Sequence, residues 1–345
     1  MTQNTARYSN KENTMNTPLA DQEFELKPIP AILFLNNKGG VAKTTDSSLT
    51  AENLCLTKGK RVLLIDFDGQ MNLTMYWVGV EHNEEDELMP PRHPDYDPDD
   101  EYDQEHLTER SNICDIFHGR QVLPHSTFLG PDDPEDITSP RVDIIAGSRE
   151  GMRDILQNLN KSGLTDKSTG QVLETTNAGK LISQLGKFCS NPALAEQYDV
   201  IIIDSGPTET PLFSAAIQAA THVISPYKPE EFSIMGTSTL INAIRKARLN
   251  RIGREEEINF LGLLPCLVDL GRDGSHEETI TQVRNDFAGD HFPEGMMITN
   301  TTAISSRQKK TSKKPDSVFS LPPSHKVRKR CDPVFQHIHD EVFSL

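Results

Sequence analysis

The stretch Ala31-Ile-Leu-Phe-Leu-Asn-Asn-Lys-Gly-Gly-Val-Ala-Lys-Thr-Thr45 decides the fold of this chain. Its first five residues are apolar and are followed by Asn-Asn and Gly-Gly, a pattern that predicts a short buried strand ending in a turn. The residues after the turn, 44–57, predict a helix. Glycines let a backbone wrap closely around phosphate groups, and the first turn of a helix offers unpaired N–H groups to them. The stretch therefore predicts a phosphate-binding loop between a strand and a helix.

Two side chains of this loop carry the chemistry that such a site needs. In a phosphate-binding loop the lysine reaches the β- and γ-phosphates and the next hydroxyl binds Mg²⁺, which assigns these roles to Lys43 and Thr44. The strict pattern GxxxxGK[ST] is not met, because Asn37 and Ala42 stand where it has glycine. The deviant form KGGxxKTT is met instead, and it begins with a second lysine, Lys38.

Carboxylates end two further apolar runs. Arg61-Val-Leu-Leu-Ile-Asp-Phe67 is followed by Asp68, and Asp199-Val-Ile-Ile-Ile-Asp204 itself ends in an acid. Ligands of open α/β sheets bind outside the carboxyl ends of the strands. We therefore expect Asp66, Asp68 and Asp204 to lie beside the loop, where carboxylates hold Mg²⁺ and position the attacking water in phosphoryl transfer.

Strands and helices alternate along the rest of the chain. Further strands are predicted at 142–146, 222–225 and 259–268, with late ones at 296–299 and 318–321. Helices are predicted at 149–160, 173–189, 234–250, 277–287 and 333–343. Apolar strands alternating with helices are typical of an α/β fold, a mostly parallel twisted sheet flanked by helices on both faces. Residues 1–28 are predicted to be a flexible tail and 29–345 a single domain, with the Pro- and Asp-rich stretch 81–140 as an inserted polar loop.

Composition and charge exclude several classes of protein. Hydrophobic residues make up 35% of the 345 residues, and no apolar run approaches the roughly 18 residues of a membrane-spanning helix. The polar start lacks the apolar segment of a secretory signal, and the five cysteines form no CxxC pair. We therefore expect a cytoplasmic protein without a disulfide framework. The net charge of −16 is uneven, because residues 81–136 carry −15 whereas residues 307–330 carry +8. The acidic average therefore does not exclude an anionic partner.

The three motifs, in this order and spacing, resemble the ParA/MinD family of deviant Walker A ATPases. The segment Val223-Ile-Ser-Pro-Tyr-Lys-Pro-Glu-Glu-Phe-Ser-Ile-Met-Gly236 is similar to its ParA branch. The resemblance implies a P-loop ATPase that uses ATP and Mg²⁺ and closes into a homodimer around the nucleotide. The residues that it implies for nucleotide binding are Lys38, Gly39, Gly40, Val41, Ala42, Lys43, Thr44, Thr45, Pro226, Lys228 and Pro229.

The resemblance also implies roles for single residues. Lys38 would reach the partner's nucleotide, and Lys43 and Thr44 would hold the phosphates and Mg²⁺ of their own chain. Asp68 matches the acid that assists water attack. Asp204 matches the second acid on the Mg²⁺ side, with Asp66 nearby, so that Thr44, Asp66 and Asp204 form the implied metal site.

The sequence departs from the family pattern in three places. Ala42 replaces a glycine and adds a methyl group near the β-phosphate. Ser205-Gly206-Pro207 replaces the more usual Cys/Ala-Pro-Pro after the acid. The acidic stretch 81–140 has no counterpart in compact members.

For this chain the ParA branch implies slow hydrolysis that segregates or positions a plasmid, a chromosome region or another cargo. The ATP dimer would bind DNA non-specifically and so associate with the nucleoid, and a ParB-like partner on the cargo would stimulate hydrolysis. DNA binding of this kind rests on contacts between Lys or Arg and phosphates. The candidate residues are Arg245, Lys246, Arg248, Arg251, Lys309 and Lys310.

Three alternatives stay open. One is a ParA-like switch on a protein assembly, which includes a defence or mobile-element system. Another is a metabolic or redox relative. The third is a MinD-like regulator at a membrane, which needs an amphipathic helix with a basic face. The closing helix is better suited to pack on its own domain, because its apolar spacing is that of a buried helix and Asp340 and Glu341 would repel anionic lipid.

Overall fold

The computed structural model describes residues 29–133, 136–158, 164–165, 172–173, 178–207, 211–230, 236–249, 257–271, 274–300, 304 and 317–344. The stretch 1–28, predicted as a flexible tail, lies outside these residues. Within the described residues no helix is long and apolar enough to cross a membrane.

Seven strands of the described chain form one sheet in the order β11-β10-β1-β9-β2-β6-β5. Neighbouring strands are parallel, except that β5 is antiparallel to β6. The predicted α/β class with a mostly parallel sheet is confirmed. The strands are β1 (Ala31–Phe34), β2 (Arg61–Phe67), β5 (His125–Ser126), β6 (Arg141–Ile145), β9 (Val200–Ser205), β10 (His222–Tyr227) and β11 (Asn259–Pro265).

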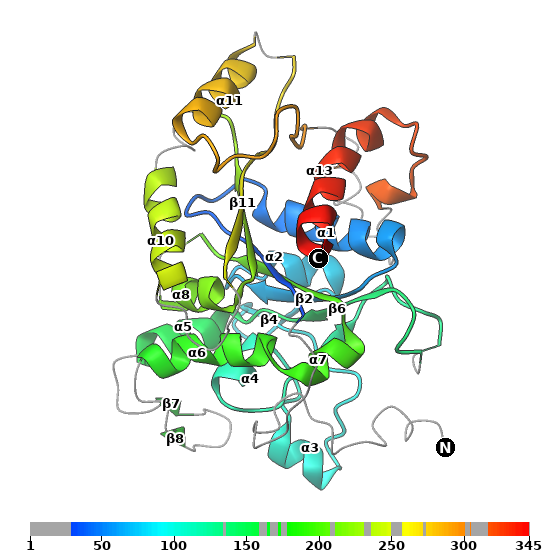
Figure 1. The fold of residues 1–345 in the computed structure, drawn as a ribbon. Coiled ribbons are helices and arrows are strands. Elements are labelled where there is room, and N and C mark those ends of the chain that lie inside the picture. The colour runs from blue at the N-terminus through cyan, green and yellow to red at the C-terminus, as the bar shows by residue number, and fades with distance from the viewer. Residues whose placement is uncertain are drawn as a thin grey trace.

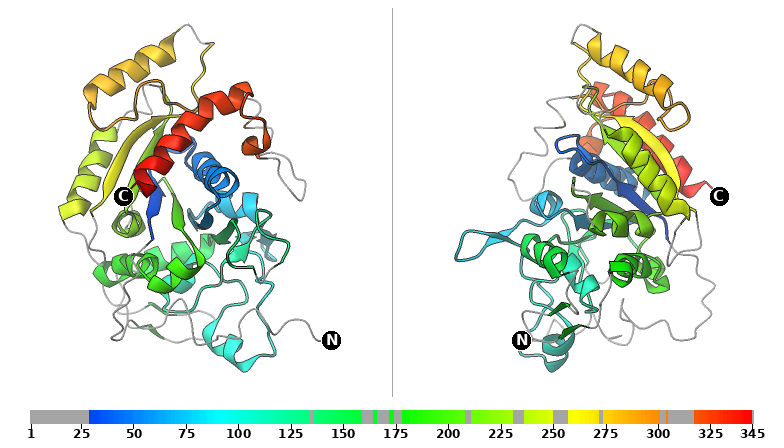
Figure 2. Two further views of the ribbon diagram at one scale, coloured as in Figure 1. Left: turned by 45° about the vertical axis from the view of Figure 1, so that its right-hand side comes forward. Right: turned by 90° about the vertical axis from the view of Figure 1, so that its left-hand side faces the viewer.

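Helices cover both faces of this sheet (Figures 1 and 2). The main ones are α1 (Lys43–Lys58), α2 (Asn72–Trp77), α5 (Arg149–Asn158), α6 (Ala178–Cys189), α7 (Pro192–Gln197), α8 (Pro211–Ala219), α10 (Thr237–Leu249), α11 (Ser275–Asp286) and α13 (Lys326–Phe343). Two short hairpins, β3 (Glu81–His82) with β4 (Leu88–Met89) and β7 (Leu164–Thr165) with β8 (Val172–Leu173), lie outside the main sheet.

The alternation of side chains along each strand explains the two layers. Ala31 and Leu33 of β1 belong to a hydrophobic cluster with α5, α6, α8 and α10, whereas Ile32 and Phe34 belong to a second cluster with α1, α2 and α13. Successive strand residues point to opposite faces. Because both faces are covered, both sets are apolar, and the strands read as continuous apolar runs.

The end of the chain differs from the sequence prediction. The strand predicted at 318–321 is instead the 3₁₀ helix η1 (Val318–Ser320), whose first turn Ser317 caps by accepting a hydrogen bond from the N–H of Phe319. The predicted strand 296–299 is an irregular segment with one bridge, between Val268 and Thr299. The closing helix begins at Lys326 rather than at 333 and lies beside α1 (Figure 2).

Much of the stretch 81–140 is built into the domain, which differs from the long polar loop predicted there. It contains α3 (Glu101–His106) and α4 (Ile113–Phe117), and β5 extends the main sheet. Ile113 and Phe117 are fully buried in the cluster that includes α6. Ion pairs inside the segment, such as Arg110 with Glu81 at 2.6 Å, offset part of its acidic charge.

Candidate nucleotide site

The glycine-rich loop joins β1 to α1 and leaves room beside its backbone. Gly40 has a positive φ of 71°, and apart from the adjacent residues no heavy atom lies within 4 Å of where a Cβ would stand on Gly39 or Gly40. Ala42 holds the N-cap position of α1 with φ 77° and ψ 14°, and no side chain caps the helix. A helix N-terminus beside open backbone is suited to a phosphate group.

Lys43 is the buried cation of the loop. Its side chain is folded back over the loop, because Nζ donates a hydrogen bond to the carbonyl oxygen of Lys38 at 2.9 Å. Burial lowers the pKa of Lys43, whereas the nearby carboxylates of Asp204 and Asp68 raise it. A partly desolvated ammonium group at the start of a helix favours an anionic ligand. The neighbouring Lys38 is exposed at the tip of the loop.

Asp204 is the last residue but one of β9 and is fully buried. Its Oδ1 accepts a hydrogen bond from Ser47 Oγ at 3.3 Å, whereas its Oδ2 has no hydrogen-bond partner. Burial and the carboxylate of Asp66 raise the pKa of Asp204 to about 8, and a hydrogen bond with Thr44 opposes that rise. An unpaired buried carboxylate oxygen next to a threonine hydroxyl fits a divalent cation.

The rest of a Mg²⁺ shell would have to come from elsewhere. Among the described residues no group of three or more His, Cys, Asp or Glu side chains is placed to hold a metal ion. Mg²⁺ at nucleotide sites takes only one or two protein ligands and completes its shell with phosphate oxygens and water. Thr44 and Asp204 therefore fit a metal ion that arrives with a nucleotide.

Asp66, predicted as a metal ligand, accepts hydrogen bonds through both of its carboxylate oxygens. Its Oδ2 accepts hydrogen bonds from the N–H of Thr74 at 2.8 Å and from Thr74 Oγ1 at 2.6 Å, and its Oδ1 accepts one from the N–H of Asp68 at 3.2 Å. The pKa of Asp66 is raised to about 7, chiefly by burial. Both oxygens of Asp66 are thus held by protein donors, and its role as a metal ligand stays a prediction.

Asp68, the predicted catalytic acid, is half-buried where the chain turns from β2 into α2. Its Oδ1 accepts a hydrogen bond from the N–H of Gln70 at 3.0 Å. The register pairs Asp66 with Asp204 and Phe67 with Ser205, so Asp68 lies beside Gly206 just beyond the paired strands. The three predicted acids are therefore neighbours at the carboxyl edge of the sheet.

The end of β10 is attached directly to the loop. Asn36 donates a hydrogen bond from Nδ2 to the carbonyl oxygen of Pro226 at 2.7 Å, and its Oδ1 accepts one from the N–H of Lys38 at 2.9 Å. Pro226 lies in β10, and Lys228 and Pro229 come directly after that strand; Lys228 pairs with Glu230 at 2.6 Å. The sequence analysis did not predict the roles of Asn36, Thr74 and Gly206. Each role depends on a contact with a residue elsewhere in the chain, namely Pro226, Asp66 and Asp68.

The predicted DNA-binding residues are only partly described. Arg245 pairs with Asp290 at 3.1 Å, and Arg248 donates a hydrogen bond to the carbonyl oxygen of Ile258 at 2.7 Å. Lys246 is exposed on the same helix, α10. Arg251, Lys309 and Lys310 lie outside the described residues.

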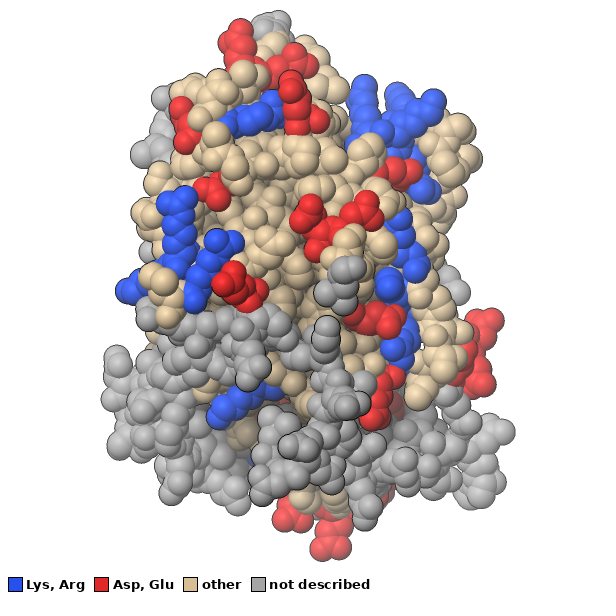
Figure 3. Space-filling view, in the orientation of Figure 1, with Lys and Arg blue, Asp and Glu red and all other residues tan. Residues whose placement is uncertain are grey.

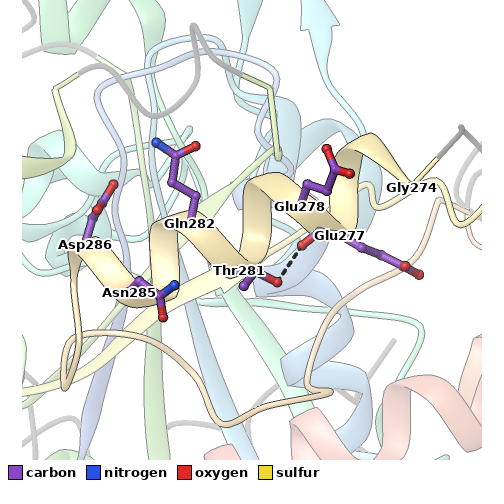
Figure 4. Close-up of a pocket in the computed structure, with 7 residues that line it drawn as sticks. All are labelled: Gly274, Glu277, Glu278, Thr281, Gln282, Asn285 and Asp286. Atoms are coloured by element: carbon purple, nitrogen blue, oxygen red, sulfur yellow. Dashed lines mark hydrogen bonds between the residues drawn. The ribbon is translucent and has the colours of Figure 1, made fainter.

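A pocket along α11 is lined by none of the predicted nucleotide-binding or DNA-binding residues (Figure 4). Its lining consists of Gly274, Glu277, Glu278, Thr281, Gln282, Asn285 and Asp286. Three of these side chains are acidic and none is basic, so the pocket would repel a nucleotide phosphate. Figure 1 shows α11 at the edge of the molecule, beyond β11.

The family model described as an AAA domain matches residues 29–125 and 175–257, which is more than half of the chain. The chain belongs to the ParA-like P-loop ATPases. This confirms the predicted family, and the match also spans residues 81–125 of the predicted insertion.

Relatives and solved structures agree with this assignment. The chromosome-partitioning ATPase Soj of Thermus thermophilus is 24% identical to this ParA-like chain over 264 residues, which are 76% of this chain and 78% of that protein. Apo McdA from Cyanothece aligns with a TM-score of 0.60 at 15% identity, covering 90% of this chain and 99% of that one. The pNOB8 ParA bound to nonspecific DNA aligns with a TM-score of 0.55 at 19% identity, covering 92% and 98%. At such identities the two structures establish the shared fold.

Proposed function

We propose that this ParA-like protein is an ATP-driven positioning switch. It binds ATP with Mg²⁺, dimerises around the nucleotide, binds DNA non-specifically in that state and hydrolyses ATP slowly to segregate or position a cargo. The observation that carries the proposal is the buried Lys43 inside an open glycine-rich loop, next to the unpaired oxygen of Asp204. A DNA-bound protein of this kind works in the cytoplasm, on the nucleoid.

The residues of this chain divide the work. Lys43 and the first turn of α1 hold the phosphates, and Thr44 with Asp204 would hold the metal ion. When bound, Mg²⁺ neutralises charge on the phosphate oxygens. Asp68 orients and accepts a proton from the attacking water. Lys38, exposed at the loop tip, is free to reach the nucleotide of a second protomer.

The surface charges refine where DNA would bind. Figure 3 shows Lys and Arg gathered over α10 and over the start of α13. Two of the α10 arginines already have partners within the chain. At the start of α13, Lys326, Lys329 and Arg330 are exposed and make no ion pair with a described residue. We name these three residues the α13 basic surface and propose that it contacts DNA phosphates together with Lys246.

DNA retention tests the proposal directly. Binding to a duplex of arbitrary sequence should be strong with ATP, weak with ADP or no nucleotide, and should fall steeply as salt rises. Replacing Lys326, Lys329 and Arg330 by Glu should abolish retention and leave ATP affinity unchanged. Lys187→Glu, an exposed charge reversal on α6, is the matched control and should retain DNA.

Two results would reject parts of the proposal. Equal DNA retention with ATP, with ADP and without nucleotide would show that ATP does not control DNA binding. No retention in any state would favour a switch on a protein assembly, the alternative cargo. The structure gives no support to a MinD-like membrane anchor, because Val334, Phe335 and Ile338 of α13 are buried against the protein's own sheet.

A further inference from the structure

The turn that carries Asp68 lies between two other loops. In the sheet order, β2 has β9 on one side and β6 on the other. The residues that follow these strands therefore flank the turn after β2. Gly206 directly follows β9, and Arg149 begins α5 after the short connection 146–148 that follows β6.

Gly206 touches the turn from the β9 side in two ways. Its N–H donates a hydrogen bond to the carbonyl oxygen of Phe67 at 3.2 Å. A Cβ at this position would lie 3.1 Å from Asp68 Oδ1 and 3.5 Å from its Cγ. An alanine would therefore press on the carboxylate, and a proline would in addition lack the N–H donor. Glycine is suited to this position although its φ is not in the left-handed region.

Arg149 holds the turn from the β6 side. Its Nε donates a hydrogen bond to the carbonyl oxygen of Gly69 at 3.3 Å, and its Nη2 donates one to Gln70 Oε1 at 3.2 Å. The N–H of Gln70 in turn donates to Asp68 Oδ1. The guanidinium group of Arg149 therefore acts on the Asp68 carboxylate indirectly, through Gln70.

We infer that Gly206 and Arg149 are positioning residues that fix the Asp68 carboxylate from the two neighbouring strands. This inference rests on the proposed function of Asp68 in hydrolysis. The rate of hydrolysis should depend on both Gly206 and Arg149. ATP affinity should depend on neither, because neither residue belongs to the phosphate-binding loop.

The first experiment measures single-turnover hydrolysis of ATP with protein in excess, together with ATP affinity and thermal unfolding. Gly206→Ala should lower the hydrolysis rate roughly ten- to a hundredfold, the effect of displacing a reacting group by less than about 1 Å, with ATP affinity within about twofold. Gly130→Ala is the matched control, since a Cβ there meets Thr127 at an ordinary 3.8 Å. An unchanged rate in a folded Gly206→Ala protein would overturn the role of Gly206.

The second experiment tests whether both residues act through Asp68. If they do, adding Gly206→Ala or Arg149→Ala to Asp68→Asn should lower the residual rate no further, whereas independent roles would multiply the losses. Arg149→Ala alone should be slow and partly restored by added guanidinium. Arg153→Ala on the same helix should be neither slow nor restored. Absence of rescue together with multiplied losses would overturn the inference.

The outcome for Asp68→Asn separates the inference from the proposed function. If Asp68→Asn turns over ATP at the wild-type rate, the catalytic role of Asp68 itself is rejected. If Asp68→Asn is inactive while Gly206→Ala and Arg149→Ala are both normal, the proposed function stands and the positioning inference is rejected.

Discussion

Replacing Ala42 by glycine should make the protein more stable, although glycine destabilises most helices. Ala42 is held at φ 77° and ψ 14°, in the left-handed region, at the N-cap of α1. That conformation costs an L-residue with a Cβ roughly 1–2 kcal/mol. Glycine relieves this strain but loses about 0.5–1 kcal/mol more backbone entropy on folding. The expected net gain is about 0.5–1 kcal/mol in the free energy of unfolding.

Equilibrium urea denaturation and thermal unfolding measure this gain. For a domain of this size a net 0.5–1 kcal/mol corresponds to a rise in Tm of about 1–2 °C. The control is the same substitution within the same helix. Ala51 is fully buried in the middle of α1, so Ala51→Gly should destabilise by about 1 kcal/mol or more.

The test is that Ala42→Gly and Ala51→Gly change the free energy of unfolding in opposite directions. Ala42→Val should also be destabilising, because a β-branched residue is least tolerated at positive φ. A loss of stability in Ala42→Gly like that of Ala51→Gly would refute the left-handed strain at Ala42.

Three further outcomes are expected. Lys43→Ala should abolish ATP binding by titration calorimetry, because no other ammonium is buried in the loop among the described residues; unchanged affinity would reject the loop assignment. Asp204→Asn should remove most of the difference in ATP affinity between Mg²⁺ and EDTA, and a preserved difference would place the metal elsewhere. Burial and the neighbouring His93 lower the pKa of His125 to about 4. The contribution of His125 to the free energy of unfolding should therefore be full above pH 6.5 and fall by about 3 kcal/mol as the pH drops towards 4, because the unfolded state binds the proton first. His125→Gln should reduce this loss of stability, measured by urea denaturation at each pH. An equal loss in the wild type and the variant would show that His125 does not cause it.

The apolar strands and the phosphate-binding loop could be predicted because their signals are local. A run such as 200–204 is buried on both faces, so its pattern needs no knowledge of its neighbours. The same logic failed at 318–321, where an apolar run became η1 because Ser317 caps a turn. It also failed at α4, whose five residues are too few to display a helical period.

Residue roles at the site were harder to predict than residue positions. The sequence placed Asp66 at the strand end correctly, but its partner Thr74 lies in the next helix and decides what its oxygens can do. Gly206 was visible only as a departure from the family pattern. Its meaning depends on the register between β2 and β9, which brings it beside Asp68.

The packing of α13 on α1 has a thermodynamic consequence. One end of α1 begins at the phosphate loop, and Lys58 near its other end donates a hydrogen bond to Gln336 of α13, the helix that starts with the basic surface. A single packed unit therefore joins the two surfaces where ATP and DNA are proposed to bind. If ATP raises the affinity for DNA by some factor through this unit, linkage requires DNA to raise the affinity for ATP by the same factor. A protein bound to DNA would then hold its ATP more tightly, and release from DNA would lower its affinity for ATP.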